Sequence, residues 1–167
     1  NNQAATQCWR LAMENVETPT ALIFSRQTIK DLPEGVDYIG VEKGAYEVVK
    51  EEHPDVILLA SGSEVSTLVD TLPLLQEKKI KARVISCPSE GLFRSQSAEY
   101  QEKLLPADAK IFALTAGLPA TFEGLVGSNG YIYGLDHFGY SAPYQVLDDK
   151  LGFTPQQVAD KIIDFVK

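Results

Sequence analysis

Arg26 is the residue best placed for chemistry, because it directly follows an apolar run in the tripeptide SRQ at 25–27. The run, residues 20–25, is bounded by Pro19 and is typical of a buried strand. In an open parallel sheet, ligands bind beyond the carboxyl ends of the strands. A guanidinium there could hold a phosphate group through its forked donors. A surface ion pair is the alternative interpretation.

A second candidate is the sequence SGSE at 61–64, which joins a predicted strand to a predicted helix. Gly62 permits a tight turn, and either Ser61 or Ser63 could cap the helix. Backbone N–H groups at such a turn could also hold an anion or an effector. The segment lacks both the G-x-G-x-x-G fingerprint and the lysine of a phosphate-binding loop, so a purely structural cap is the simpler interpretation.

No other residues have the spacing of a catalytic or metal site. Asp136 and His137 are adjacent, so on an extended segment they point to opposite sides and would not relay a proton. No serine sits in a G-x-S-x-G motif. His53 precedes a proline in a polar turn, and Cys8 and Cys87 lack paired ligand spacing. The sequence therefore predicts no catalytic and no metal-binding residue, and two reduced cysteines that act as small buried hydrophobes.

These candidates must be positioned by the elements around them. Near-continuous apolar runs, which indicate strands buried on both faces, occupy residues 55–63, 82–89, 110–117 and 130–135, and residues 45–50 are a further strand candidate. We expect helices within residues 4–13, 64–79, 119–127, 142–151 and 154–166, with residues 28–43 as a linker. This alternation predicts an α/β fold: a three-layer open sheet of about five mostly parallel strands with helices on both faces.

Several helix ends are predicted by local signals. Pro73 lies inside the pattern at 64–79 and should kink or break that helix early. Ser141 is the expected N-cap for residues 142–151, and Gly152 is the expected stop. The strongest signal is at 154–157, where Thr154 can cap, a proline fits the first helical position, and Gln157 can complete a capping box.

Composition narrows the class of protein. The 167 residues carry 15 Lys+Arg and 23 Asp+Glu, a formal net charge of -8. This charge disfavours binding to nucleic acid or to an anionic membrane. No secretory leader or apolar run long enough for a membrane span is present, so we expect a cytoplasmic protein. Because the chain opens at Asn1 in a helix-like stretch, we interpret it as a piece of a longer polypeptide.

Six phrases, in this order, resemble the transketolase family. They are PTALIFSRQ (19–27), GAYEV (44–48), DVILLASGSEV (55–65), ARVISCPSEGLFRSQSAEYQEKLLP (82–106), VGSNGYIYGLDHFGYSAP (126–143) and LGFTPQQV (151–158). The resemblance covers nearly the whole chain. It implies that residues 1–30 are the tail of a pyrimidine-binding domain, 31–43 a linker and 44–167 the C-terminal domain.

The resemblance also implies a function for the whole enzyme. Such enzymes use thiamine diphosphate and a divalent cation, Mg²⁺ or Ca²⁺, to move a two-carbon ketol unit from a ketose phosphate to an aldose phosphate in the pentose phosphate pathway. Their active sites lie between the subunits of a homodimer. Arg26 then contacts the sugar phosphate, whereas the cofactor ligands lie in parts of the family's chain that precede this one. The resemblance therefore implies a scaffolding chain that binds no cofactor by itself.

Some features of the sequence leave other interpretations open. Thr115 stands where many relatives carry glutamate, and Phe122 where tryptophan is frequent. Related thiamine enzymes such as dihydroxyacetone synthase share much of this domain. A regulatory module that holds an anion or nucleotide near residues 61–64, and a free-standing protein evolved from the domain, are further alternatives.

Overall fold

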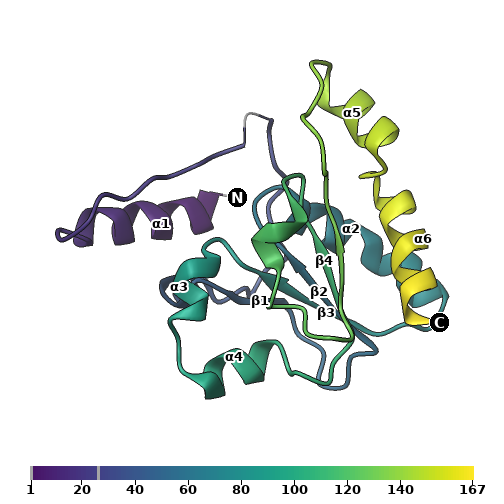
Figure 1. Cartoon of the computed structure of the whole chain (residues 1–167), viewed down its shortest axis with the longest axis horizontal. Helices are drawn as coiled ribbons and strands as arrows, with labels where there is room; N and C mark the ends of the chain where they lie inside the picture. The colour runs from purple at the N-terminus through teal and green to yellow at the C-terminus, as the bar shows by residue number, and fades with distance from the viewer. Residues whose placement is uncertain (1, 26) are drawn as a thin grey trace.

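Five short strands form a sheet at the centre of the molecule (Figure 1). The computed structural model describes residues 2–25 and 27–167. Every strand lies in a run that the sequence predicted: β1 (Tyr46–Val49), β2 (Val56–Ala60), β3 (Ala82–Ser86), β4 (Ile111–Leu114) and β5 (Tyr131–Tyr133). Their order is β1-β3-β2-β4-β5, and within these residues β1 alone is antiparallel to its neighbour. The predicted sheet is confirmed.

Helices cover both faces of the sheet, as the continuous apolar strands predicted. Along β2, Leu58 and Ala60 belong to one buried core, and Ile57 and Leu59 to the other, because successive side chains point to opposite faces. The first core is completed by α2 (Glu64–Glu77) and α6 (Pro155–Val166), and the second by α3 (Glu90–Arg94), α4 (Ala98–Leu104) and the 3₁₀ helix η2 (Pro119–Phe122). In Figure 1, α2 and α6 lie on one side of the sheet and α3 and α4 on the other.

Pro73 does not end α2, so the expected early break does not occur. An interior proline removes one backbone hydrogen bond and costs about 3 kcal/mol. Leu68 and Leu75, on either side of Pro73, are both fully buried in the same core. Burying each of these side chains contributes roughly 1.5–3 kcal/mol, so packing on both sides offsets the cost of the proline.

The last two helices differ in how well their starts were predicted. α5 (Tyr144–Leu151) has Pro143 as its N-cap, so the expected cap at Ser141 is wrong. The reason is local: the residue before a proline is pushed out of the helical region, so a helix cannot begin at position 142. The stop at Gly152 is confirmed, with φ 77°, and so is the capping box between Thr154 and Gln157.

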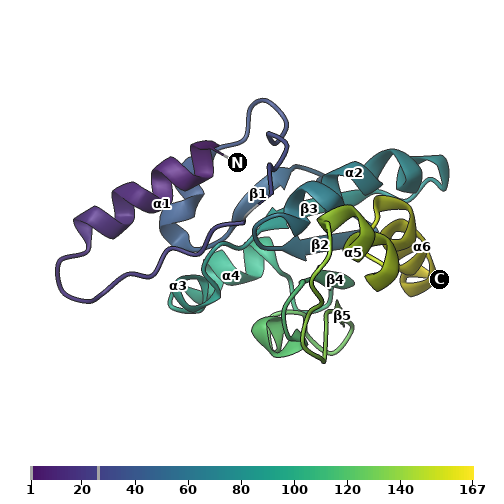
Figure 2. The ribbon, with the colours of Figure 1, turned by 90° about the horizontal axis from the view of Figure 1, so that it is seen from above.

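The first 45 residues hold the largest departures from expectation. Helix α1 (Asn2–Glu14) is present, and the expected linker contains a 3₁₀ helix, η1 (Tyr38–Lys43). Residues 20–25 are not a strand, and Ile23 within them is 94% exposed. A buried strand needs neighbouring backbone for its hydrogen bonds, and the described sheet does not extend to this segment. Figure 2 shows α1 and the chain after it projecting beside the sheet.

Within residues 2–25 and 27–167, no helix is both long and apolar enough to cross a membrane.

Candidate functional site at the carboxyl edge of the sheet

The carboxyl ends of β2 and β4 lie side by side, with Ala60 opposite Leu114 in a parallel register. From β2 the chain continues to β3, and from β4 it continues to β5 on the opposite side. The connections therefore diverge between β2 and β4, and open α/β sheets bind ligands at such a switch point. Residues 61–64 follow β2 directly, so the predicted anion segment lies at this edge.

The turn at Gly62 is confirmed, but the expected side-chain cap at Ser63 is not made. Gly62 has φ 63°, a left-handed conformation that glycine adopts without a steric cost. Ser63 is the N-cap residue of α2 with φ -66° and ψ -33°. A capping side chain normally projects from extended backbone. Because Ser63 is already helical, its hydroxyl instead donates to Glu64 Oε1, at 3.0 Å.

A carboxyl group of the chain itself occupies the start of α2. Burial raises the pKa of Glu64 above its ordinary value, hydrogen bonds from its own backbone N–H and from Ser63 oppose this shift, and the charge of Asp148 on α5 reinforces it. A carboxylate at a helix N-terminus takes the position that an external anion would use. The anion or effector site at Ser61, Gly62 and Ser63 therefore stays a prediction. The Glu64 carboxylate would compete with an external anion for the N–H groups at this helix start.

The chain around Arg26 meets the same helix. Arg26 itself lies outside the described residues. Before it, Ser25 Oγ donates to Ser63 Oγ at 3.5 Å. After it, Lys30 Nζ lies 2.6 Å from Asp70 Oδ2 in an ion pair that raises the pKa of Lys30. The segment that carries the predicted phosphate ligand thus contacts α2 at two points.

The remaining candidates from the sequence form no cluster. Asp136 and His137 are exposed, and His137 Nδ1–H donates to the neighbouring carbonyl of Phe138 at 2.8 Å. His53 is exposed in its turn. Cys87 is buried, as predicted, and Cys8 is partly buried. Within the described residues no group of three or more His, Cys, Asp or Glu side chains could hold a metal ion.

The two positions that depart from the family pattern have structural roles here. Phe122 is 1% exposed and packs in the core that faces α3 and α4. The hydroxyl of Thr115 accepts a hydrogen bond from the backbone N–H of Gly117 at 3.0 Å, in the turn after β4.

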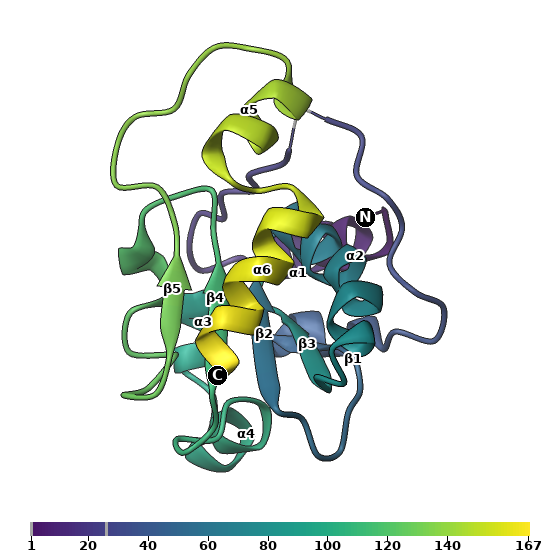
Figure 3. The same cartoon turned by 90° about the vertical axis from the view of Figure 1, so that its right-hand side faces the viewer.

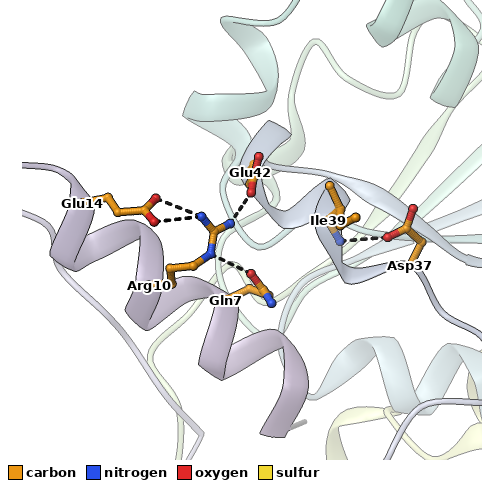
Figure 4. Close-up of polar contacts among 6 residues, drawn as sticks. All are labelled: Gln7, Arg10, Glu14, Asp37, Ile39 and Glu42. Carbon is orange, nitrogen blue, oxygen red and sulfur yellow. Dashed lines mark hydrogen bonds and ion pairs between the residues drawn. The ribbon is translucent and has the colours of Figure 1, made fainter.

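An ion-pair network that the sequence analysis missed attaches α1 to η1 (Figure 4). The Arg10 guanidinium donates to Gln7, to both carboxylate oxygens of Glu14 at 3.0 and 2.9 Å, and to Glu42 of η1. The pairing of Arg10 with Glu14, four residues on, could have been found from helical spacing. The contact with Glu42 could not, because 32 residues separate the partners.

The family of the chain follows from comparison with known proteins. The family described as the transketolase-like TK C-terminal domain matches residues 44–154. The transketolase of Halalkalibacterium halodurans is 42% identical over 154 residues, which is 90% of this chain and 23% of that protein. The transketolase of Aquifex aeolicus is 39% identical over 160 residues, which is 93% of this chain and 23% of that protein.

Solved structures agree with the sequence relatives. Transketolase from Leishmania mexicana matches with a TM-score of 0.90 and 31% identity, over 99% of this chain and 24% of that one. The chain therefore spans about a quarter of the length of the relatives it matches. With the sheet order, the switch point and the family match in agreement, this chain belongs to the transketolase family and contains its C-terminal domain.

Proposed function

We propose that the chain works as part of a thiamine-diphosphate-dependent transketolase that transfers a two-carbon ketol unit from a ketose phosphate to an aldose phosphate. The proposal rests on the match to a transketolase that is about four times longer, with a TM-score of 0.90 over 99% of this chain. Sugar phosphates as substrates are supported by a similar transketolase from Pichia stipitis, 32% identical, that was solved in complex with sedoheptulose 7-phosphate.

Within that enzyme we assign the chain an architectural role. Residues 1–30 are the tail of the pyrimidine-binding domain, 31–43 the linker and 44–167 the C-terminal domain of a cytoplasmic homodimer. Large exposed apolar side chains support this division, because soluble proteins usually cover such patches with partner surface. Seven of those on the described residues lie either on the N-terminal arm, residues 2–25, or on the loop before α5: Trp9, Met13, Val16, Ile23, Phe24, Phe138 and Tyr140.

Arg26 is the one substrate contact that we propose for this chain. A guanidinium suits a sugar phosphate because it donates two parallel hydrogen bonds to phosphate oxygens. Thiamine diphosphate and its Mg²⁺ or Ca²⁺ supply the carbanion chemistry and are held by the rest of the enzyme. The rival proposal, a regulatory anion site at residues 61–63, is less well supported because Glu64 brings a carboxyl group to the same helix start.

The test is Arg26→Gln in the full-length enzyme, assayed with an aldose phosphate and with the same aldose lacking its phosphate. Hydrogen bonds to charged groups contribute about 1.5–3 kcal/mol, so we expect the KM for the phosphorylated acceptor to rise about tenfold or more. The KM for the unphosphorylated acceptor should be unchanged. An equal effect on both acceptors would remove Arg26 from the phosphate site.

A further inference from the structure

An asparagine followed directly by a glycine, Asn129–Gly130, lies in the turn that leads into β5. Residues 128 and 129 form the turn, and Asn129 is exposed to water. The turn precedes β5, whereas residues 61–64 follow the parallel strand β2, so the two segments lie at opposite ends of the sheet. In Figure 3, β5 leads from the end that carries the turn toward the end where α5 lies. The turn is therefore separate from the candidate site.

Asparagine is among the heat-labile residues of proteins, because the backbone nitrogen of the next residue can attack its side-chain amide. Here the Gly130 nitrogen would form a bond to Asn129 Cγ and lose its proton, while the C–N bond of the side-chain amide breaks and ammonia leaves. The succinimide ring that results takes up one water molecule and opens to aspartate or to isoaspartate. In isoaspartate the backbone runs through the side-chain carbonyl. Water is the only co-reactant, and nothing is oxidised or reduced.

The backbone around Gly130 favours this attack. Gly130 has no Cβ that would hinder the approach of its nitrogen to the neighbouring side chain. β5 is an edge strand, and the carbonyl of Tyr133 accepts a hydrogen bond from the backbone N–H of Thr115 on the side of β4. Since alternate residues of a strand direct their backbone groups to opposite sides, Tyr131 also faces β4 and the N–H of Gly130 points to the free edge.

Asn15 provides a contrast within the same chain. It is also exposed, but Val16 follows it, and a side chain branched at Cβ hinders attack by its own backbone nitrogen. The Asn15 amide nitrogen donates to Thr18 and to Thr20, both at 2.9 Å. The Asn129 amide nitrogen donates only at 3.5 Å, to the carbonyl of Asp108. The amide of Asn129 is thus held less firmly, and its neighbour hinders the attack less.

We propose that Asn129 is a site of spontaneous deamidation, where this protein acquires isoaspartate as it ages. The turn has no room for the product. A Cβ on Gly130 would lie 2.2 Å from the Val126 carbonyl oxygen, so the chain closes tightly on itself here. Isoaspartate adds a methylene group to the backbone inside this turn and forces it open. Deamidation also replaces the donor to the Asp108 carbonyl with a carboxylate, which repels that oxygen.

The experiment is prolonged incubation of the full-length protein at neutral and mildly alkaline pH, followed by tryptic digestion and mass spectrometry. Asn129 is the only asparagine of the tryptic peptide 111–150, and Asn15 is the only one of the peptide 11–26. We expect deamidation of Asn129 to be about tenfold faster than that of Asn15, because of the branched neighbour of Asn15. Isoaspartate in peptide 111–150 should accept a methyl group from an isoaspartyl methyltransferase, and Asn129→Gln should remove this signal.

Equal rates at the two asparagines would overturn the proposal. So would a rate in the folded protein far below that in a synthetic peptide of residues 126–134, because the turn would then protect Asn129. Aspartate without isoaspartate would exclude the ring intermediate. Hydrogen exchange tests the opening of the turn: residues 126–130 should exchange faster in the aged protein than in Asn129→Asp, which has the charge but not the extra methylene. Equal exchange in the two would show that isoaspartate does not open the turn.

Discussion

Glu64 shows how opposing effects act on one residue at the candidate site. Its position in the first turn of α2 favours the ionised carboxylate, because the N–H groups there carry partial positive charge. Burial favours the neutral acid, since a charge loses its hydration in a partly buried position. The pKa of Glu64 lies above its ordinary value of 4.5, so burial outweighs the favourable hydrogen bonds. The carboxylate at this edge is therefore held at a cost to stability.

The pH dependence of stability tests this balance. Because the pKa of Glu64 is higher in the folded than in the unfolded chain, folding is favoured below about pH 4.5 and loses that contribution as the pH rises through the folded pKa. The free energy of unfolding of Glu64→Gln should therefore gain on that of the parent between pH 4 and pH 8, measured by urea titration. Glu77→Gln, at the exposed far end of α2, controls for loss of charge. A difference that stays constant with pH would contradict the prediction.

At the scale of elements, α6 combines a local start signal with a long-range packing surface. Thr154 and Gln157 form a reciprocal capping box, and the Gln157 amide also donates to the Asp149 carbonyl of α5 at 3.1 Å. Val158 and Ile162 are fully buried in the core shared with α2. The capping box fixes where the helix begins and links it to α5, while the apolar face fixes where it packs.

Removing the cap should destabilise the chain without unfolding it. Thr154→Ala leaves the backbone N–H of Gln157 without its side-chain acceptor and should lower the free energy of unfolding by about 0.5–2 kcal/mol. Chemical denaturation with an unchanged denaturant slope is the measurement. Thr154→Ser keeps the hydroxyl and is the matched control. Equal losses in the two variants would show that the methyl group, and not the cap, carries the effect.

At the scale of the whole molecule, the chain is a well-packed sheet with an arm that lacks a covering surface. One buried core lies on each face of the sheet, whereas Trp9 and Phe24 on the arm stack on each other and remain about half exposed. Arg10 and the partly buried Leu11 attach this arm to the domain. The distribution of apolar surface fits a chain that is completed by the rest of its enzyme.

The isolated 167-residue chain should therefore have no ketol transferase activity and should not bind thiamine diphosphate. The reason is that the proposed division of roles assigns the cofactor ligands to the rest of the enzyme. The measurement is an assay of the purified chain with thiamine diphosphate and Mg²⁺, together with calorimetric titration of the cofactor. Turnover above background, or saturable cofactor binding, would contradict the proposed division of roles.

Features of this protein that depend on a few neighbouring residues could be predicted from the sequence. The strands β2, β3 and β4 are continuous apolar runs, which only burial on both faces explains, and the capping box at Thr154 is complete within four residues. Their physical causes, side-chain alternation and backbone capping, act over a few residues. The resemblance to the family could be recognised for the same reason, because each of its phrases is a short run of neighbouring residues.

Other features depend on residues that are distant in sequence. Residues 20–25 have the composition of a strand but no neighbouring backbone in the described sheet, and Pro73 is tolerated because packing against α6 continues beyond it. The contacts of Ser25 with Ser63 and of Lys30 with Asp70 span 38 and 40 residues. No periodicity encodes such pairs, because only the folded chain brings them within hydrogen-bonding distance.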